Sequence, residues 1–176
     1  MFESASLSGS KPQQYAELAG QARGLLSGER DRIANAANLS ALVYHALPQL
    51  NWVGFYLVEP RTGDLLLGPF HGRPACVRIP IGKGVCGTAA ERRETVIVED
   101  VHAFPGHIAC DSASNSEVVV PILDHGRLIG VLDLDSPDHG RFDSDDARGL
   151  ELLVQEGSGL QQRLANASSP VRCGDP

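Results

Sequence analysis

Six short segments rich in β-branched and aromatic residues, all between residues 51 and 135, constrain the fold of this chain more than any other feature. Each has the length and composition of a strand, and turn residues separate neighbouring segments. Apolar stretches such as VVVPIL predict that the central strands are buried on both faces. We expect the strands at residues 51–59, 65–70, 75–81, 95–100, 117–124 and 127–135.

Helical patterns flank this block on both sides. Ser10 and Pro12 are typical of a helix start, Pro48 ends a second helical pattern, and acidic residues from Asp143 onward begin the last one. We expect helices at about residues 11–26, 31–47 and 143–160, with a short one inside the block at 85–92. This order predicts an α+β domain in which a central, mostly antiparallel sheet is covered by the N- and C-terminal helices.

The chain is predicted to form one domain with a short segment at each end. Its 176 residues suffice for a single hydrophobic core, and the sequence contains no internal repeat. We interpret residues 1–10 as a flexible arm, residues 11–165 as the folded domain and residues 166–176 as a disordered tail.

The charge balance bears on partners and compartment. The 22 acidic and 15 basic residues give a formal net charge of −7, which argues against a nucleic acid or an anionic membrane as partner. The opening MFESASLSGSKPQQ lacks the apolar region of an export signal, and no apolar run approaches the roughly 18 residues of a spanning helix. We therefore expect a cytoplasmic protein whose thiols stay reduced.

Three of the four cysteines fall within the predicted domain. Cys76 and Cys86 lie beside glycine-rich turns, and Cys110 ends a polar loop in GHIACDSASNSE, while Cys173 lies in the tail. A lone cysteine is most often a small buried apolar residue. Three within 35 residues, one of them on a loop between rigid elements, favour redox chemistry over that interpretation.

Two other ligand types fit the sequence poorly. His107 and Cys110, with Cys76 and Cys86, could make a zinc site, but the usual C-x₂₋₄-C pair is absent and we expect no metal. The glycines of GKGVCG imitate a dinucleotide fingerprint, yet the helix that follows is short and no second nucleotide-binding half is found. We interpret the glycines as a turn that brings Cys86 close to a pocket.

Asp133 and Asp135 are two residues apart on a predicted strand and must share a face. They lie either at an exposed edge or in a pocket, and the pattern does not choose between these. Buried carboxylates would repel each other, so that one would hold a proton or both would need a cation. Such a pair suits an ammonium group or proton delivery to a substrate oxygen. Glu117 begins the partner strand and could join them.

Trp52 and Tyr56 also share a strand face, being four residues apart. Their side chains either pack in the core or form an aromatic wall for a small ligand.

At these residues the sequence resembles the free methionine-R-sulfoxide reductase family, whose members are GAF domains. The matching stretches are NWVGFYLV, LLLGPFHGRPACVRIPIGKGVCGTAA, VIVEDVHAFPGHIACDSASNSEVVVPI and GVLDLDSPDHGRF, which cover most of residues 51–142. ACVRIP, GVCGTA and GHIACDxxSNSE are together highly specific, because generic GAF domains carry none of them. The flanking helices agree in pattern only.

The resemblance implies a single GAF-like domain and a role for each motif residue. Cys110 corresponds to the nucleophile, Cys76 to the principal resolving cysteine and Cys86 to the third motif cysteine. The substrate-pocket residues of the family correspond to Trp52, Tyr56, Glu117, Asp133 and Asp135.

The activity that the resemblance implies is reduction of free L-methionine (R)-S-oxide to L-methionine. Cys110 would become a sulfenic acid and form an intramolecular disulfide, which thioredoxin would reduce with electrons from NADPH through its reductase. No bound cofactor is implied, and family members suggest a homodimer.

Two questions stay open at this point. Carboxylates near Cys110, including Asp111, should raise the pKa of its thiol, and either the substrate ammonium or His107 could offset this. The alternative function is a non-catalytic GAF module that senses a small ligand, which explains a pocket but not three motif cysteines.

Overall fold

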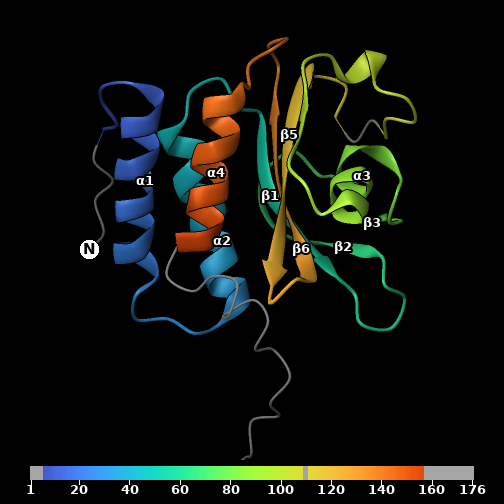
Figure 1. Cartoon of the computed structure of the whole chain (residues 1–176), viewed down its shortest axis with the longest axis horizontal. Coiled ribbons are helices and arrows are strands. Elements are labelled where there is room, and N and C mark those ends of the chain that lie inside the picture. Colours follow the sequence, from blue (N-terminus) through green and yellow to red (C-terminus); the bar gives the residue numbers. More distant parts are fainter. Residues whose placement is uncertain (1–5, 109–110, 157–176) are drawn as a thin grey trace, which may run out of the picture.

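The computed structural model describes residues 6–108 and 111–156, and its elements follow the expected order. Two helices precede the strands, a short helix is inserted among them and a last helix follows (Figure 1). The α+β prediction is thereby confirmed. The elements are α1 (Lys11–Leu26), α2 (Arg32–Ala46), β1 (Trp52–Val58), β2 (Leu65–Gly72), β3 (Arg78–Ile79), α3 (Gly84–Arg92), β4 (Val96–Val98), the 3₁₀ helix η1 (Val101–Ala103), β5 (Ser116–Asp124), β6 (Arg127–Ser136) and α4 (Ser144–Glu156).

The six strands form one antiparallel sheet in the order β3-β2-β1-β6-β5-β4. β6 lies between β1 and β5, so its residues have a neighbour on each side. Asp135 is paired with Trp52 of β1 and with Glu117 of β5. The register therefore places an aromatic side chain and two carboxylates in one row across the sheet.

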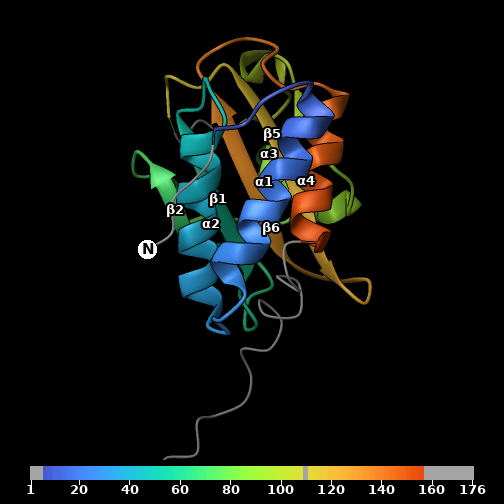
Figure 2. The same ribbon diagram turned by 90° about the vertical axis from the view of Figure 1, so that its left-hand side faces the viewer.

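The two faces of the sheet carry different layers (Figures 1 and 2). Helices α1, α2 and α4 cover one face, and α3 with the neighbouring loops covers the other. Val118 and Val120 of β5 pack in the core beneath the three long helices, whereas Val119 packs toward α3. The central strands are thus buried on both faces, as their apolar sequence predicts.

Asp146 fixes α4 to α1. It lies in the first turn of α4, is only 1% exposed, and accepts hydrogen bonds from the Tyr15 hydroxyl at 2.9 Å and from Arg141 at 3.2 Å. Lys11 of α1 also forms an ion pair with this carboxylate. The acidic start of α4 therefore does more than complement the helix dipole, because it joins two helices that are far apart in the sequence.

The third strand is shorter than predicted. The expected strand at residues 75–81 reduces to Arg78–Ile79. The reason lies just before it, where the backbone carbonyl of Cys76 accepts a hydrogen bond from the Tyr56 side chain instead of joining the sheet. The polar loop after residue 100 also contains an unexpected 3₁₀ turn, which begins where the Asp100 side chain accepts from the backbone N–H of His102.

Some predictions fall on parts of the chain that the structure does not describe. These are residues 1–5 of the arm at residues 1–10, the end of the last helix, the tail at 166–176, and Cys110. Among the helices of residues 6–108 and 111–156, none has the length and hydropathy needed to span a membrane.

A pair of helical glycines gives a test of the α1–α4 contact. A Cβ at Gly149 would lie 2.1 Å from Cγ of Tyr15, whereas a Cβ at Gly24 would meet nothing within 4 Å. We expect Gly149→Ala to lower the free energy of unfolding by about 1–3 kcal/mol despite the better helix propensity of alanine. Gly24→Ala should raise it by about 0.4–1 kcal/mol. Urea unfolding measures both, and a gain of stability in both variants would contradict the packing described here.

Candidate active site

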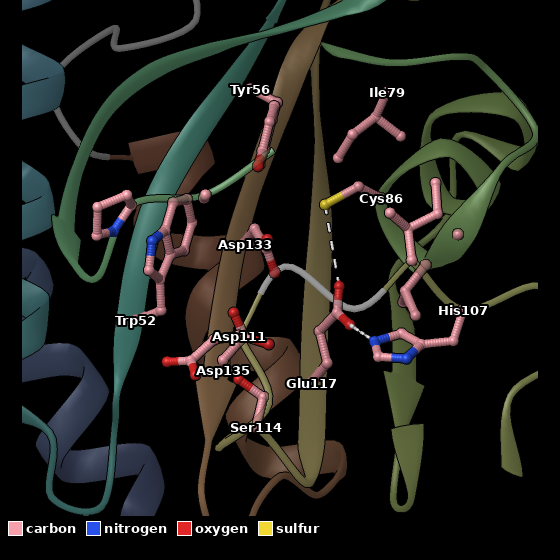
Figure 3. A pocket seen from close by; sticks show the side chains of 15 residues that line it. Trp52, Tyr56, Ile79, Cys86, His107, Asp111, Ser114, Glu117, Asp133 and Asp135 are labelled. Carbon is pink, nitrogen blue, oxygen red and sulfur yellow. Dashed lines mark hydrogen bonds and ion pairs between the residues drawn. The ribbon is translucent and has the colours of Figure 1, made fainter. Parts of the chain in front are cut away.

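A pocket opens on the face of the sheet that α3 covers (Figure 3). Its wall comes from β1, from β3 and the segment before it, from α3, from the loop after η1, from the start of β5 and from the second half of β6. The lining residues are Trp52, Tyr56, Pro74, Ala75, Ile79, Gly84, Val85, Cys86, His107, Ile108, Asp111, Ser114, Glu117, Asp133 and Asp135. All five predicted substrate-pocket residues are therefore brought together.

Three carboxyl groups share this pocket. Glu117 and Asp133 are each 6% exposed, and Asp135 is half-buried. Burial raises the pKa of all three: that of Asp133 to about 7, and those of Glu117 and Asp135 well above their ordinary values. Proximity to Asp133 adds to the upward shift of the pKa of the other two. Of the two arrangements that the sequence left open, the structure shows the pocket and not the exposed edge.

Asp133 has an unmet hydrogen-bonding capacity. Its Oδ1 atom is buried and has no hydrogen-bond partner among the described residues. A buried acceptor without a donor costs about 1–3 kcal/mol, so a ligand that brings an N–H to this point recovers that free energy. The unpartnered oxygen makes Asp133 the carboxyl of this pocket that is best placed to accept from a cationic donor.

The cysteines occupy different environments. Cys86 is 3% exposed in the first turn of α3, and its Sγ donates to Oε1 of Glu117 at 3.9 Å. Burial, followed by the charges of Asp133 and Glu117, raises the pKa of this thiol, which therefore stays protonated and is a poor nucleophile. Cys76 is half-buried and disulfide-bonded. The predicted nucleophile Cys110 lies outside the described residues.

Trp52 and Tyr56 combine the two roles that their spacing allowed. Both are almost fully buried in the core beneath α3, with ring centroids 5.9 Å apart, and both line the pocket. The polar atom of each side chain also donates a hydrogen bond to the segment before β3. Nε1 of Trp52 donates to the carbonyl of Arg73, and the Tyr56 hydroxyl donates to that of Cys76, both at 3.0 Å.

His107 lies beside Glu117, with Nε2 3.9 Å from Oε2 (Figure 3). Burial lowers the pKa of its imidazole, which favours the neutral ring. The sequence suggested His107 as an aid to the Cys110 thiolate, and this stays a prediction because Cys110 lies outside the described residues.

Other lining residues were missed from the sequence. Ser114 is 4% exposed, and Asn51, at the entry to β1, donates to its hydroxyl at 3.0 Å. The only signal for Ser114 was its place in the SNSE motif. Ile79 and Val85 carry no signal that distinguishes them from ordinary core residues.

The glycine turn and a cation site can be judged from the geometry. A Cβ at Gly87 would lie 2.4 Å from the Pro80 carbonyl oxygen, so the turn is tightly packed rather than flexible. Cys86 lines the pocket, as predicted. The potential ligand atoms of Cys86, Glu117 and Asp133 lie within 4.8 Å of one another. Among the described residues, this group could hold a cation, and it differs from the His107 and cysteine set that the sequence suggested for zinc.

Comparison with known proteins places this site in a family. A GAF domain model matches residues 35–158. The free methionine-R-sulfoxide reductase of Escherichia coli is 52% identical over 146 residues, which are 83% of this chain and 87% of that protein.

Two solved structures extend the similarity to the fold. The free methionine-R-sulfoxide reductase of Neisseria meningitidis in complex with its substrate is 42% identical, with a TM-score of 0.89, over 95% of this chain and 99% of that one. The reduced form of fRMsr from Staphylococcus aureus is 52% identical, with a TM-score of 0.79, over 85% of this chain and 94% of that one.

The raised pKa of Asp133 predicts a pH-dependent stability. The pKa of this carboxyl is about 7 in the folded protein and ordinarily 3.8, so the folded state holds a proton that the unfolded state releases. Stability should therefore fall as the pH rises from about 4 to about 7. Asp133→Asn keeps the shape and removes this ionisation, and its free energy of unfolding in urea should fall less over the same range.

Asp124→Asn, at the far end of β5, is the matched control and should keep the pH dependence of the wild type. A difference between wild type and Asp133→Asn that is constant from pH 4 to pH 8 would contradict the assigned ionisation.

Proposed function

The chain belongs to the free methionine-R-sulfoxide reductase family of GAF-domain proteins, and we propose that it reduces free methionine-R-sulfoxide by way of a cysteine sulfenic acid. The observation that carries this proposal is the pocket itself. A buried, unpartnered carboxylate oxygen of Asp133 lies among protonatable groups, and the disulfide-bonded Cys76 follows directly after two residues of the pocket wall.

Asp133 takes the substrate's α-ammonium in this proposal. An ammonium supplies the N–H donor and the positive charge that Oδ1 lacks. Burial raises the pKa of all three carboxyl groups, so an ammonium that enters the pocket favours ionisation of the one it contacts while a neighbouring carboxyl keeps its proton. A peptide-bound methionine sulfoxide has no such ammonium, which accounts for a preference for the free amino acid.

The first chemical step begins with the Cys110 thiolate, which attacks the sulfoxide sulfur. Two electrons pass from the thiolate to that sulfur as the substrate's S–O bond breaks. A protonated carboxyl, Glu117 or Asp135, gives a proton to the departing oxygen. The bond formed between the Cys110 sulfur and the substrate sulfur then breaks, and its electron pair stays on the substrate sulfur. The hydroxyl becomes bonded to the Cys110 sulfur, which gives a Cys110 sulfenic acid and releases methionine.

Cys76 then resolves the sulfenic acid. Its sulfur bonds to that of Cys110, and the hydroxyl leaves as water with the proton of the Cys76 thiol. Thioredoxin, reduced by NADPH through its reductase, restores the two thiols by exchange. Cys86 is the less suitable resolving group because its buried thiol is held protonated beside Glu117.

Two cysteine variants test the mechanism. Cys110→Ser should abolish reduction, because a hydroxyl is a far weaker nucleophile at neutral pH. Cys76→Ser should still form one methionine per protein in a single turnover without thioredoxin, and its sulfenic acid should be trapped by dimedone. Its NADPH consumption in the thioredoxin-coupled assay should fall sharply.

Substantial turnover by Cys110→Ser would move the nucleophile elsewhere. Wild-type protein that binds methionine sulfoxide without forming methionine would instead support the sensor function.

The proposed ammonium contact predicts that the loss of activity in a variant depends on whether the substrate carries an α-ammonium. Asp133→Asn should lower kcat/KM for free methionine-R-sulfoxide by roughly ten- to two-hundredfold. This range corresponds to the loss of a hydrogen bond to a charged group, which contributes about 1.5–3 kcal/mol. N-acetylmethionine sulfoxide should be a poor substrate of the wild type and should lose much less activity in the variant. Equal losses on both substrates would mean that Asp133 acts on the sulfoxide oxygen, and no loss on either would refute its place in the site.

A further inference from the structure

Side chains that take no part in the proposed chemical steps connect the two segments that carry the reactive cysteines. Nη1 of Arg73, three residues before Cys76, lies 3.6 Å from Oδ1 of Asp111. Asp111 is the residue that follows Cys110 in the sequence. Its side chain is 9% exposed, so it is held within the protein while the Arg73 side chain reaches it from the surface.

Asn51 holds the same carboxylate from the opposite side. Its Nδ2 donates to Oδ2 of Asp111 at 3.3 Å and to the Ser114 hydroxyl at 3.0 Å. The backbone N–H of Ala113 donates to Oδ1 of Asp111 at 2.9 Å. The start of the 111–114 segment is therefore fixed to the beginning of β1.

The beginning of β1 also holds the other segment. Trp52, next to Asn51, donates to the Arg73 carbonyl, and Tyr56 donates to the Cys76 carbonyl. One short stretch of strand thus fixes both segments, and the Arg73–Asp111 ion pair joins them directly.

We propose that Arg73, Asn51 and Asp111 are positioning residues for the resolving step, because they hold the segment after Cys110 against the segment that ends in Cys76. This inference rests on the proposed function, in which the Cys76 thiol must reach the Cys110 sulfenic acid. Disulfide formation needs the two sulfurs within a narrow range of distance and angle, whereas attack on the substrate needs only Cys110 and the pocket.

The test separates the two steps in one experiment. Fully reduced protein is mixed with one equivalent of methionine sulfoxide without thioredoxin, and methionine and dimedone-reactive sulfenic acid are followed in time. Arg73→Gln should prolong the lifetime of the sulfenic acid by about two- to fivefold, because an exposed ion pair contributes only a small free energy. Asn51→Ala removes a hydrogen bond to a charged group and should prolong it by about tenfold or more. The rate of methionine formation should stay within twofold of the wild type in both.

Matched variants and the stability of the disulfide complete the design. Arg73→Lys keeps the charge and should restore most of the wild-type rate. Arg78→Gln removes an exposed arginine from the same region, where it pairs with Glu59 instead, and should change nothing. In a dithiol redox buffer, the disulfide of Arg73→Gln should be reduced at a correspondingly lower reductant concentration, while urea unfolding of the reduced protein stays unchanged.

Two outcomes would overturn the proposal. An unchanged sulfenic acid lifetime in both Arg73→Gln and Asn51→Ala would show that the contacts do not position the cysteines. Equal slowing of methionine formation and of sulfenic acid loss would place the residues in the first step. If instead the sulfenic acid of Cys76→Ser disappears as fast as that of the wild type, the resolving role of Cys76 fails, which is a failure of the proposed function.

Discussion

The pairing of β6 with β1 on one side and β5 on the other is the constraint on which the rest of the structure depends. Its register sets Asp135 between Trp52 and Glu117. A shift of one residue would turn Asp133 and Asp135 toward the helical face and Leu132 and Leu134 toward the pocket. The large apolar core beneath α1, α2 and α4 prevents that shift, because it already contains Leu132 and Leu134. The helical layer thus determines which side chains of β6 face the pocket, although α1, α2 and α4 do not line it.

The pocket is electrostatically unfavourable, and the fold tolerates it because the opposite face supplies the stability. Three carboxyl groups and a thiol share a buried space in which burial and the neighbouring carboxyls raise the pKa of the thiol and of Glu117 and Asp135. In contrast, the buried Asp146 is surrounded by Lys11, Tyr15 and Arg141. The protein therefore buries one carboxylate with full compensation and leaves another, Asp133, with an oxygen that has no partner among the described residues. A buried carboxylate with full compensation is typical of a structural role, whereas a buried carboxyl with an unpartnered oxygen is typical of a binding site.

The sequence predicted the element order from local pattern, whereas the family resemblance was needed to assign residues to the pocket. Alternation placed Asp133 and Asp135 on one face, and the motif stretches named Trp52, Tyr56 and Glu117. What it could not predict was set by tertiary contacts. The third strand shortens because the Tyr56 hydroxyl takes the Cys76 carbonyl, and no local pattern carries that information. Asn51, Arg73 and Ser114 gain their roles only when three separate segments meet. The roles of the cysteines, the electron donor and the homodimer stay predictions.

Recognition by Asp133 has a consequence for the end of the reaction. The α-ammonium is the same in methionine sulfoxide and in methionine, so a contact with it stabilises substrate, transition state and product alike. Such a contact improves binding of a dilute substrate but does not favour release of the product. Discrimination between the two amino acids must come from the sulfoxide oxygen, which leaves as the sulfur is reduced. In the proposed mechanism, methionine therefore competes with methionine sulfoxide for the Asp133 contact, and accumulated product slows turnover.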